Sequence, residues 1–170
     1  MKFIVLLLCI ACVTANPHWD NLDEDEIASI KRTWNQVKKN EIEILYNIFK
    51  DYPEIMAKFP QFVGKELEEI KDTNQFAIHA TRIVSFFSHY ILLLGRESSK
   101  PCLRTITNDM AEVHKTRGVT KDEFSKFKES IFKYLKAHVE MDEKVEHAWN
   151  DCFDSMYYVI FANFDGKPVS

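Results

Sequence analysis

Six histidines are the side chains of this 170-residue chain best suited to bind a transition metal or exchange a proton near neutral pH. Two of them, His79 and His114, lie on or beside the apolar faces of two separate stretches with helical periodicity. Ten residues separate His89 from His79, which rotates it roughly 80° away around a helix. The other three have no obvious partner: His18, His138 and His147. Because a lone histidine is more often a core or surface residue than a ligand, the candidate chemistry belongs to the pair His79 and His114.

Aromatic side chains are dense in the sequence around these two histidines. Five phenylalanines fall between or beside them: Phe59, Phe62, Phe76, Phe86 and Phe87. Aromatic residues at helical spacing usually form a hydrophobic core, and composition alone favours that interpretation. The alternative is that two helices, each carrying one histidine, face a shared site that these aromatic residues surround.

The elements that must position these side chains are helices, because apolar residues recur with a helical period through almost the whole chain. Asp23 with Glu26, and Thr120 with Glu123, have capping-box spacing and predict two helix starts. Pro53 ends one helix and can open a short one over residues 54–59. The apolar stripes run through residues 27–37, 42–52, 76–94, 103–113, 124–135 and 145–160.

The connections between these stripes are short. Gly95 and Gly118 end the two histidine-bearing helices. The polar, proline-containing segment 96–102 is predicted to be a loop. No turn dipeptide joins two alternating apolar runs, so nothing favours strands. The sequence predicts an all-α domain of six to eight helices.

The first fifteen residues have the pattern of a secretory signal peptide. Lys2 precedes an almost wholly apolar run over residues 3–13, and Val13 and Ala15 place small residues at a cleavage site. A buried N-terminal helix is the alternative. We therefore predict a cleaved signal at 1–15, one folded domain at 16–170, and a secreted, extracellular protein. No later stretch is expected to be long and apolar enough to span a bilayer.

Composition and charge exclude several classes of partner. A net charge of −4 gives no basic surface for nucleic acid, and no basic amphipathic stretch indicates membrane binding. Cys102 and Cys152 remain after signal cleavage and either pair in an oxidising compartment or stay free. Two thiols fifty residues apart, without a Cys-x-x-Cys motif, do not make a zinc site.

Three ordered motifs resemble those of globins, in particular the extracellular haemoglobins of midge larvae. The segment 51–62, DYPEIMAKFPQF, resembles the proline-started bend of globins and the two phenylalanines that follow it. The segment 79–84, HATRIV, resembles the distal helix, and 113–119, VHKTRGV, resembles the end of the proximal helix and its turn. Trp34 and Trp149 lie where globins often carry aromatic residues in the first and last helices. The resemblance covers nearly the whole of residues 16–170 and implies a globin fold around a haem pocket.

The resemblance implies a role for each matching residue. His114 corresponds to the proximal iron ligand and His79 to the distal histidine, which would contact a bound gas. Phe59 would pack on the haem with Phe62 nearby, and Ile83 would lie beside the gas. Two arginines complete the predicted site: Arg117 would pair with a haem propionate, and Arg82 would do the same or swing towards the gas.

One spacing departs from the family. Thirty-five residues separate His79 from His114, several more than globins usually have, and the excess is expected in the 96–102 segment. The motif Cys-x-x-Cys-His is missing, so the implied cofactor is non-covalent haem b.

The resemblance implies a carrier that is not an enzyme. We expect a monomer or homodimer that binds O2 and other diatomic gases reversibly at one haem. Two alternatives stay open: a haem-dependent redox enzyme with peroxidase- or nitrite-type activity on the same fold, and a haem-free carrier of small apolar ligands.

Overall fold

The computed structural model describes residues 22–169, and this part of the chain contains helices, turns and loops but no strand. Eight α-helices and one 3-10 helix follow one another: α1 (Glu24–Val37), α2 (Glu41–Asp51), α3 (Pro53–Met56), α4 (Leu67–Ile70), α5 (Asn74–Leu93), η1 (Glu97–Ser99), α6 (Lys100–Thr116), α7 (Lys121–His138) and α8 (Glu143–Phe164). The predicted all-α class and helix number are confirmed. The predicted signal peptide lies outside the described residues.

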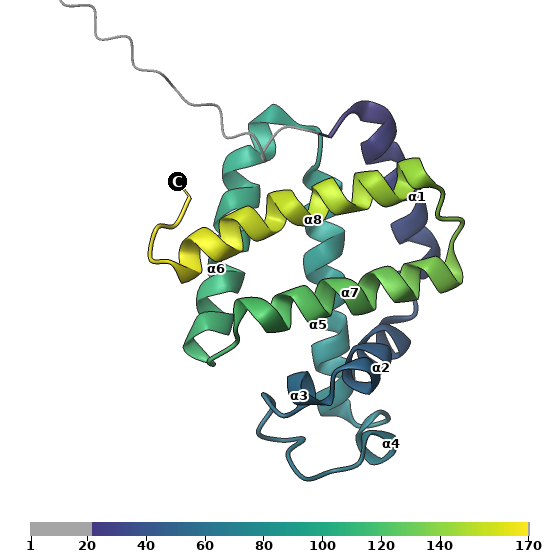
Figure 1. Ribbon diagram of the computed structural model, residues 1–170, viewed down its shortest axis with the longest axis vertical. Helices are drawn as coiled ribbons and strands as arrows, with labels where there is room; N and C mark the ends of the chain where they lie inside the picture. Colours follow the sequence, from purple (N-terminus) through teal and green to yellow (C-terminus); the bar gives the residue numbers. More distant parts are fainter. Residues whose placement is uncertain (1–21, 170) are drawn as a thin grey trace, which may run out of the picture.

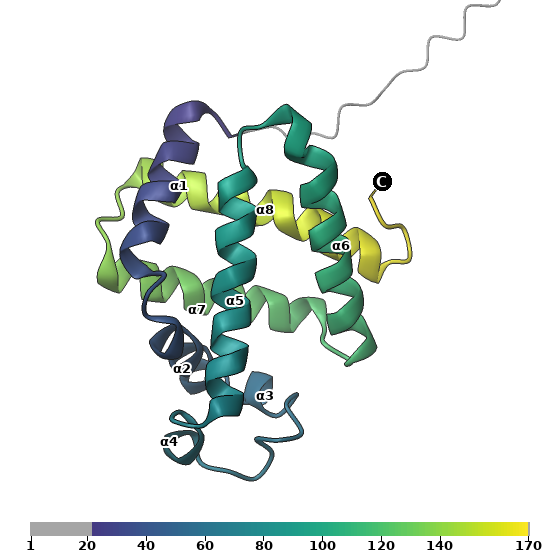
Figure 2. The same ribbon diagram turned by 180° about the vertical axis from the view of Figure 1, so that it is seen from behind.

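The long helices form two crossed layers. Figure 2 shows α1, α5 and α6 side by side in front, with α7 and α8 crossing behind them. The short helices α3 and α4 lie with α2 at one end of the molecule (Figure 1). Helices far apart in sequence therefore pack together, notably α6 with α8, α2 with α5, and α1 with α8.

Local sequence signals explain several helix starts. The Asp23 carboxylate accepts a hydrogen bond from the Glu26 amide at 2.8 Å, and the Glu26 carboxylate accepts one from the Asp23 amide at 2.9 Å. Thr120 and Glu123 form the same reciprocal pair at the start of α7. Both predicted capping boxes are confirmed. Pro53 occupies the first turn of α3, where an amide hydrogen has no helical partner to lose.

Three details of the predicted elements were wrong. The segment 96–102 is mostly helical: it contains η1 and the first turn of α6. Pro101 suits that first turn for the same reason as Pro53, so a proline here marks a helix start instead of a loop. Helix α3 ends at Met56 instead of residue 59, and α4 was not predicted.

Two residues of the predicted apolar stripes point outward. Ile42 is 36% exposed and Val113 is 46% exposed. Each lies two positions, or about 200°, from the residue that its helix buries: Ile44 in α2 and Ala111 in α6.

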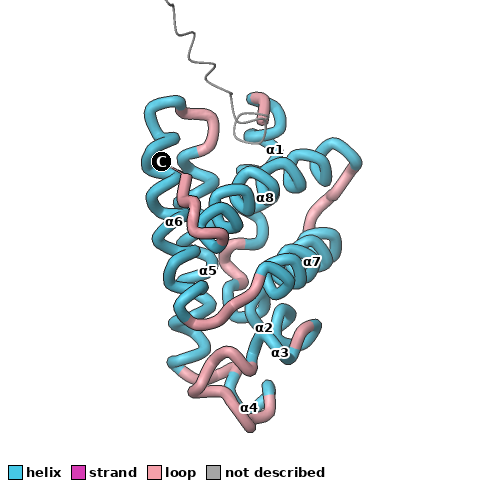
Figure 3. The backbone as a smooth tube through the Cα atoms, turned by 60° about the vertical axis from the view of Figure 1, so that its left-hand side comes forward, coloured by secondary structure: helices cyan, strands magenta, loops and turns pink. Residues whose placement is uncertain are grey.

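Helix α5 has the length and composition of a membrane span, with 20 residues and a mean hydropathy of 1.3. The expectation that no stretch after residue 15 would be long and apolar enough to span a bilayer was therefore wrong. In this fold the helix contacts α1, α2 and α6, and the tube view in Figure 3 shows it among them. These contacts account for part of its apolar composition, since only 28% of the apolar window is buried in the structure.

The two cysteines do not pair in this structure. Cys152 is completely buried in α8, whereas Cys102 is exposed near the start of α6, and both are free thiols. Burial raises the pKa of Cys152 to about 12, so this thiol stays protonated and unreactive at neutral pH.

Candidate functional site

Helices α5 and α6 bring the two predicted histidines into one neighbourhood. His79 lies in the second turn of α5 and His114 in the last turn of α6, and both are half-buried. The pKa of His79 is lowered in part by three nearby groups that carry positive charge: His114, Arg82 and Arg117. Residues from two helices and the turn after α6 therefore lie near enough to influence one another's charge.

The end of α6 holds His114 in a defined orientation. Its Nδ1 lies 2.7 Å from the carbonyl oxygen of Met110, one turn earlier. Gly118, with a φ of 72°, allows a Schellman-type ending in which the Val119 amide donates to the His114 carbonyl oxygen at 3.1 Å. Burial lowers the pKa of the His114 imidazole, so the ring is neutral at physiological pH. An Nδ1–H that donates to Met110 leaves the lone pair of Nε2 for a metal.

His79 is also held as a neutral imidazole. Burial is the main reason that its pKa falls to about 4, and the nearby charges of His114, Arg82 and Arg117 lower the pKa further. Its ring lies edge-on to Phe59, with 4.4 Å between ring centres. A neutral imidazole in this position has one N–H to donate and one lone pair to accept with.

The two predicted phenylalanines differ in their surroundings. Phe62 is completely buried and lies 6.1 Å, centre to centre, from both Phe49 of α2 and Phe76 of α5. Phe59 is only half-buried; it packs on Phe49 at 5.2 Å and turns its edge to His79. Phe62 therefore supports the site from behind, whereas Phe59 keeps surface available beside the histidine.

Further apolar side chains on α5, α6, the following turn and α7 are only partly covered. Ile83 lies one turn after His79 and packs on the edge of the core. The same is true of residues on α6, the following turn and α7: Ile106, Met110, Val119 and Phe127. The guanidinium groups of Arg82 and Arg117 lie at exposed positions, where they are accessible to anionic groups.

Sequence reasoning missed two residues that contact His114. Met110 supplies the carbonyl oxygen that fixes the ring, and its position four residues earlier in a helix is a signal that could have found it. Phe124 of α7 lies 5.5 Å, centre to centre, from the His114 ring. Only the tertiary fold brings α7 against the end of α6, so no local signal predicts this contact.

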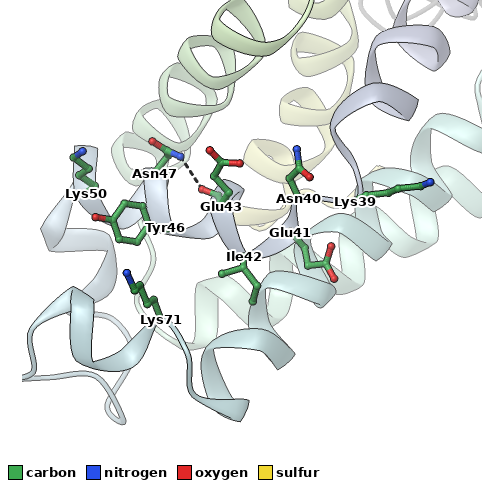
Figure 4. A pocket seen from close by; sticks show the side chains of 9 residues that line it. All are labelled: Lys39, Asn40, Glu41, Ile42, Glu43, Tyr46, Asn47, Lys50 and Lys71. Atoms are coloured by element: carbon green, nitrogen blue, oxygen red, sulfur yellow. Dashed lines mark hydrogen bonds between the residues drawn. The ribbon is translucent and has the colours of Figure 1, made fainter.

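A separate hollow of about 580 Å³ lies around the first turns of α2 (Figure 4). It contains none of the predicted site residues and is lined by Lys39, Asn40, Glu41, Ile42, Glu43, Tyr46, Asn47, Lys50 and Lys71. The Asn47 amide donates to the Glu43 carbonyl oxygen at 2.8 Å, and the ammonium groups of Lys50 and Lys71 lie within 6 Å of the centre of the Tyr46 ring. The lining mixes positive and negative side chains and gives this hollow no defined chemistry.

Comparison with known proteins places this arrangement in a family. The globin family model matches residues 42–160, which span both histidines. The chain belongs to the globin family. Globin CTT-VI of Chironomus thummi thummi is 47% identical over 165 residues, covering 97% of this chain and 99% of the relative.

Solved structures agree with this globin fold. A haemoglobin component, TA-VII, from Tokunagayusurika akamusi has a TM-score of 0.82 and 38% sequence identity, covering 85% of this chain and 97% of its own. A Drosophila melanogaster globin has a TM-score of 0.76 and 30% identity, covering 82% of this chain and 94% of its own. The resemblance to globins, and to midge haemoglobins among them, is therefore confirmed over most of the chain.

Proposed function

We propose that this globin holds one non-covalent haem b and binds O2 and other diatomic gases reversibly. The observation that carries the proposal is the orientation of His114: a neutral ring, tied by Nδ1 to Met110, with Nε2 left for a metal. The similarity to haemoglobins supports it. When bound, haem supplies the iron at which a gas molecule attaches and leaves.

His114 would be the proximal ligand. Its hydrogen bond to Met110 fixes the tautomer and orients the ring, as second-shell hydrogen bonds do for metal-bound histidines generally. The Schellman ending at Gly118 keeps the chain from fraying beyond this residue. These contacts hold the ligand atom in place before any cofactor arrives.

His79 would be the distal residue. Because its pKa lies near 4, it is neutral in body fluids and can donate one N–H to a gas that acquires partial negative charge. Such a hydrogen bond is worth roughly 1.5–3 kcal/mol, or about ten- to a hundredfold in affinity. The edge-on contact with Phe59 limits how far the ring can turn.

Apolar residues would form the walls of this site. Phe59 and Ile83 present partly covered hydrocarbon surface beside His79, which suits a flat, apolar macrocycle and keeps water away. Phe62 lies behind Phe59 and holds its ring in position. The guanidinium group of Arg117 would pair with a propionate carboxylate of the haem. Arg82 would pair with a propionate too, or would turn towards the bound gas.

The signal-peptide pattern predicted for residues 1–15 supports a proposal for where the protein acts. We propose that residues 1–15 are removed on secretion and that residues 16–170 form one globin domain, which stores or transports oxygen in extracellular body fluid. In this role the protein acts as a monomer or homodimer without a nucleic-acid or membrane partner, and it is a carrier instead of an enzyme.

The runner-up is a redox enzyme on the same site. His79 is the one residue over the site that could serve as an acid or base, and a dedicated second group is not evident among the described residues, so reversible binding is favoured. A haem-free carrier of apolar ligands is the third candidate. It accounts less well for the neutral, metal-ready nitrogen of His114.

An absorption spectrum of the purified protein separates these three functions. We expect a ferrous haem spectrum after reduction, a change when O2 is added, and return to the first spectrum when O2 is removed. A protein without haem absorption would indicate the apolar carrier. Rapid irreversible oxidation together with sustained turnover of peroxide would favour the enzyme.

A further inference from the structure

Three side chains gather where α1 meets α8, away from His79 and His114. Glu26 of α1 and His147 and Asp151 of α8 each offer one ligand atom, and these three atoms lie within 4.8 Å of one another. We propose that they form a binding site for a divalent transition cation, Zn²⁺, which joins the first helix to the last. The proposal is independent of haem and of gas binding.

The distances between the ligand atoms suit zinc. His147 Nδ1 lies 3.2 Å from Glu26 Oε1 and 3.7 Å from Asp151 Oδ2. Bonds of about 2.0–2.2 Å in a tetrahedral arrangement separate neighbouring ligand atoms by roughly 3.3–3.6 Å. The two distances to His147 Nδ1 are close to these values, and the two carboxylate oxygens lie within 4.8 Å of each other. Side-chain movement that brings the oxygens nearer would let the three atoms surround one ion, with a fourth position left for water.

Local structure already orients each ligand. His147 and Asp151 are four residues apart in α8, so both side chains project from the same face. Glu26 belongs to the capping box of α1: its Oε2 accepts the Asp23 amide hydrogen at 2.9 Å, while Oε1 faces His147. The hydrogen bond from Asp23 thus acts as a second-shell contact that holds the carboxylate.

Exposure provides both restraint and access. The side chains of Glu26 and Asp151 are 20% and 26% exposed, so their positions are restricted, whereas His147 is 67% exposed and open to an incoming ion. Glu24 and Asp25 add negative charge in the first turn of α1. A cation that reached this corner would be attracted by an acidic surface and met by partly fixed ligands.

An ion pair between His147 and the two carboxylates is the alternative to a metal site, and the zinc-binding test separates the two. An Nδ1–H donates one good hydrogen bond, so a charged His147 would satisfy one of the two carboxylates that face the same nitrogen. A dication interacts with both carboxylates at once. The nitrogen ligand and the small number of oxygens favour Zn²⁺ over Ca²⁺ or Mg²⁺, which prefer six or more oxygen ligands.

The test uses the purified protein as it is isolated, stripped of free metal with a chelator. Zn²⁺ bound at equilibrium is measured by dialysis and metal analysis. We expect the wild type to bind one more Zn²⁺ than His147→Ala, with affinity falling at least about tenfold in Asp151→Asn. Glu26→Gln should weaken binding similarly while keeping the capping box, because glutamine also serves at that position.

His138→Ala is the matched control. His138 Nε2 lies 3.6 Å from a single carboxylate, that of Glu43, so removing it should leave the zinc stoichiometry unchanged. Zn²⁺ should also raise the thermal midpoint of the wild type and of His138→Ala, but not that of His147→Ala. Equal binding by the wild type and His147→Ala, or a loss confined to His138→Ala, would overturn the proposal.

Discussion

Two regions of this globin differ in how completely their aromatic and polar groups are covered. Between α1 and α8, Trp34 and Trp149 are almost fully buried, and their rings meet edge-on at 6.3 Å. Around His79 and His114, in contrast, both imidazoles and the ring of Phe59 are only half-covered. The first region has the properties of a closed hydrophobic core. The second keeps aromatic and imidazole surface that the protein itself does not cover.

Hydrogen bonding shows the same difference. The Trp149 indole N–H donates to the Thr33 hydroxyl at 3.0 Å, and that hydroxyl donates in turn to the Ser29 carbonyl oxygen at 2.8 Å. His114 uses one ring nitrogen within its own helix and keeps the other available. We infer that stability and ligand chemistry are carried by separate parts of this fold, so they should be separable by mutation.

Removing the central indole should have the largest effect on stability. Trp149→Ala leaves a cavity where a completely buried side chain was, and we expect a loss of about 3–5 kcal/mol in the free energy of unfolding. Urea unfolding measures this loss. Oxygen affinity of the folded fraction should be almost unchanged, and Trp149→Phe, which retains a large ring, serves as the milder control. A large change in oxygen affinity would show that the regions are coupled.

Removing the imidazole of His79 should change gas binding and leave stability almost unchanged. His79→Leu deletes the N–H donor and keeps similar apolar bulk, so oxygen affinity should fall by roughly 1.5–3 kcal/mol, mostly through faster dissociation. Carbon monoxide takes on less negative charge, so its dissociation should change much less. Stopped-flow measurement of both gases checks the prediction. If both gases keep their wild-type rates, Arg82→Leu becomes the variant to compare.

The buried hydroxyl of Thr33 allows a finer test of the core. Thr33→Val keeps the side-chain shape but leaves the Trp149 indole N–H buried without its acceptor. We expect a cost of about 1–3 kcal/mol in the free energy of unfolding and no change in gas binding. Calorimetry or urea unfolding measures the cost. A neutral result would mean that water or another group takes over the hydrogen bond.

The most gradual of the expected effects is a dependence of stability on pH. The pKa of His79 is about 4 in the folded chain and near 6.5 when unfolded, so the unfolded state binds its proton first as pH falls. The stability that this neutral histidine retains above pH 6.5 is lost as pH falls towards 4. The slope is at most about 1.4 kcal/mol per pH unit. In matched haem-free preparations, His79→Leu should lose stability less steeply than the wild type over this range.

Local signals made much of the fold predictable. The reciprocal hydrogen bonds of Asp23 with Glu26 depend on residues three positions apart, so spacing alone reveals them. Gly118 marks the end of α6 for a similarly local reason. His79 and His114 stood out because each lies within a motif and the two motifs occur in a defined order.

What the sequence did not predict depends on packing between distant segments. Pro101 suits both a loop and a helix start, and the contacts of α6 with its neighbours determine which forms. The exposed position of Val113 is set by which face of α6 meets α8. Phe124 reaches His114 across a turn, and Glu26 meets His147 across 121 residues. The spacing of residues along the chain does not predict such contacts.

His114 is the proposed iron ligand, and the most direct test of this assignment is the spectrum of His114→Ala. Alanine removes the Nε2 donor and leaves most of α6 intact, so we predict that the variant loses haem or holds it loosely. Added imidazole should restore a five-coordinate ferrous spectrum, while far-UV circular dichroism remains that of the wild type. A normal five-coordinate ferrous spectrum in His114→Ala, without imidazole, would contradict the assignment.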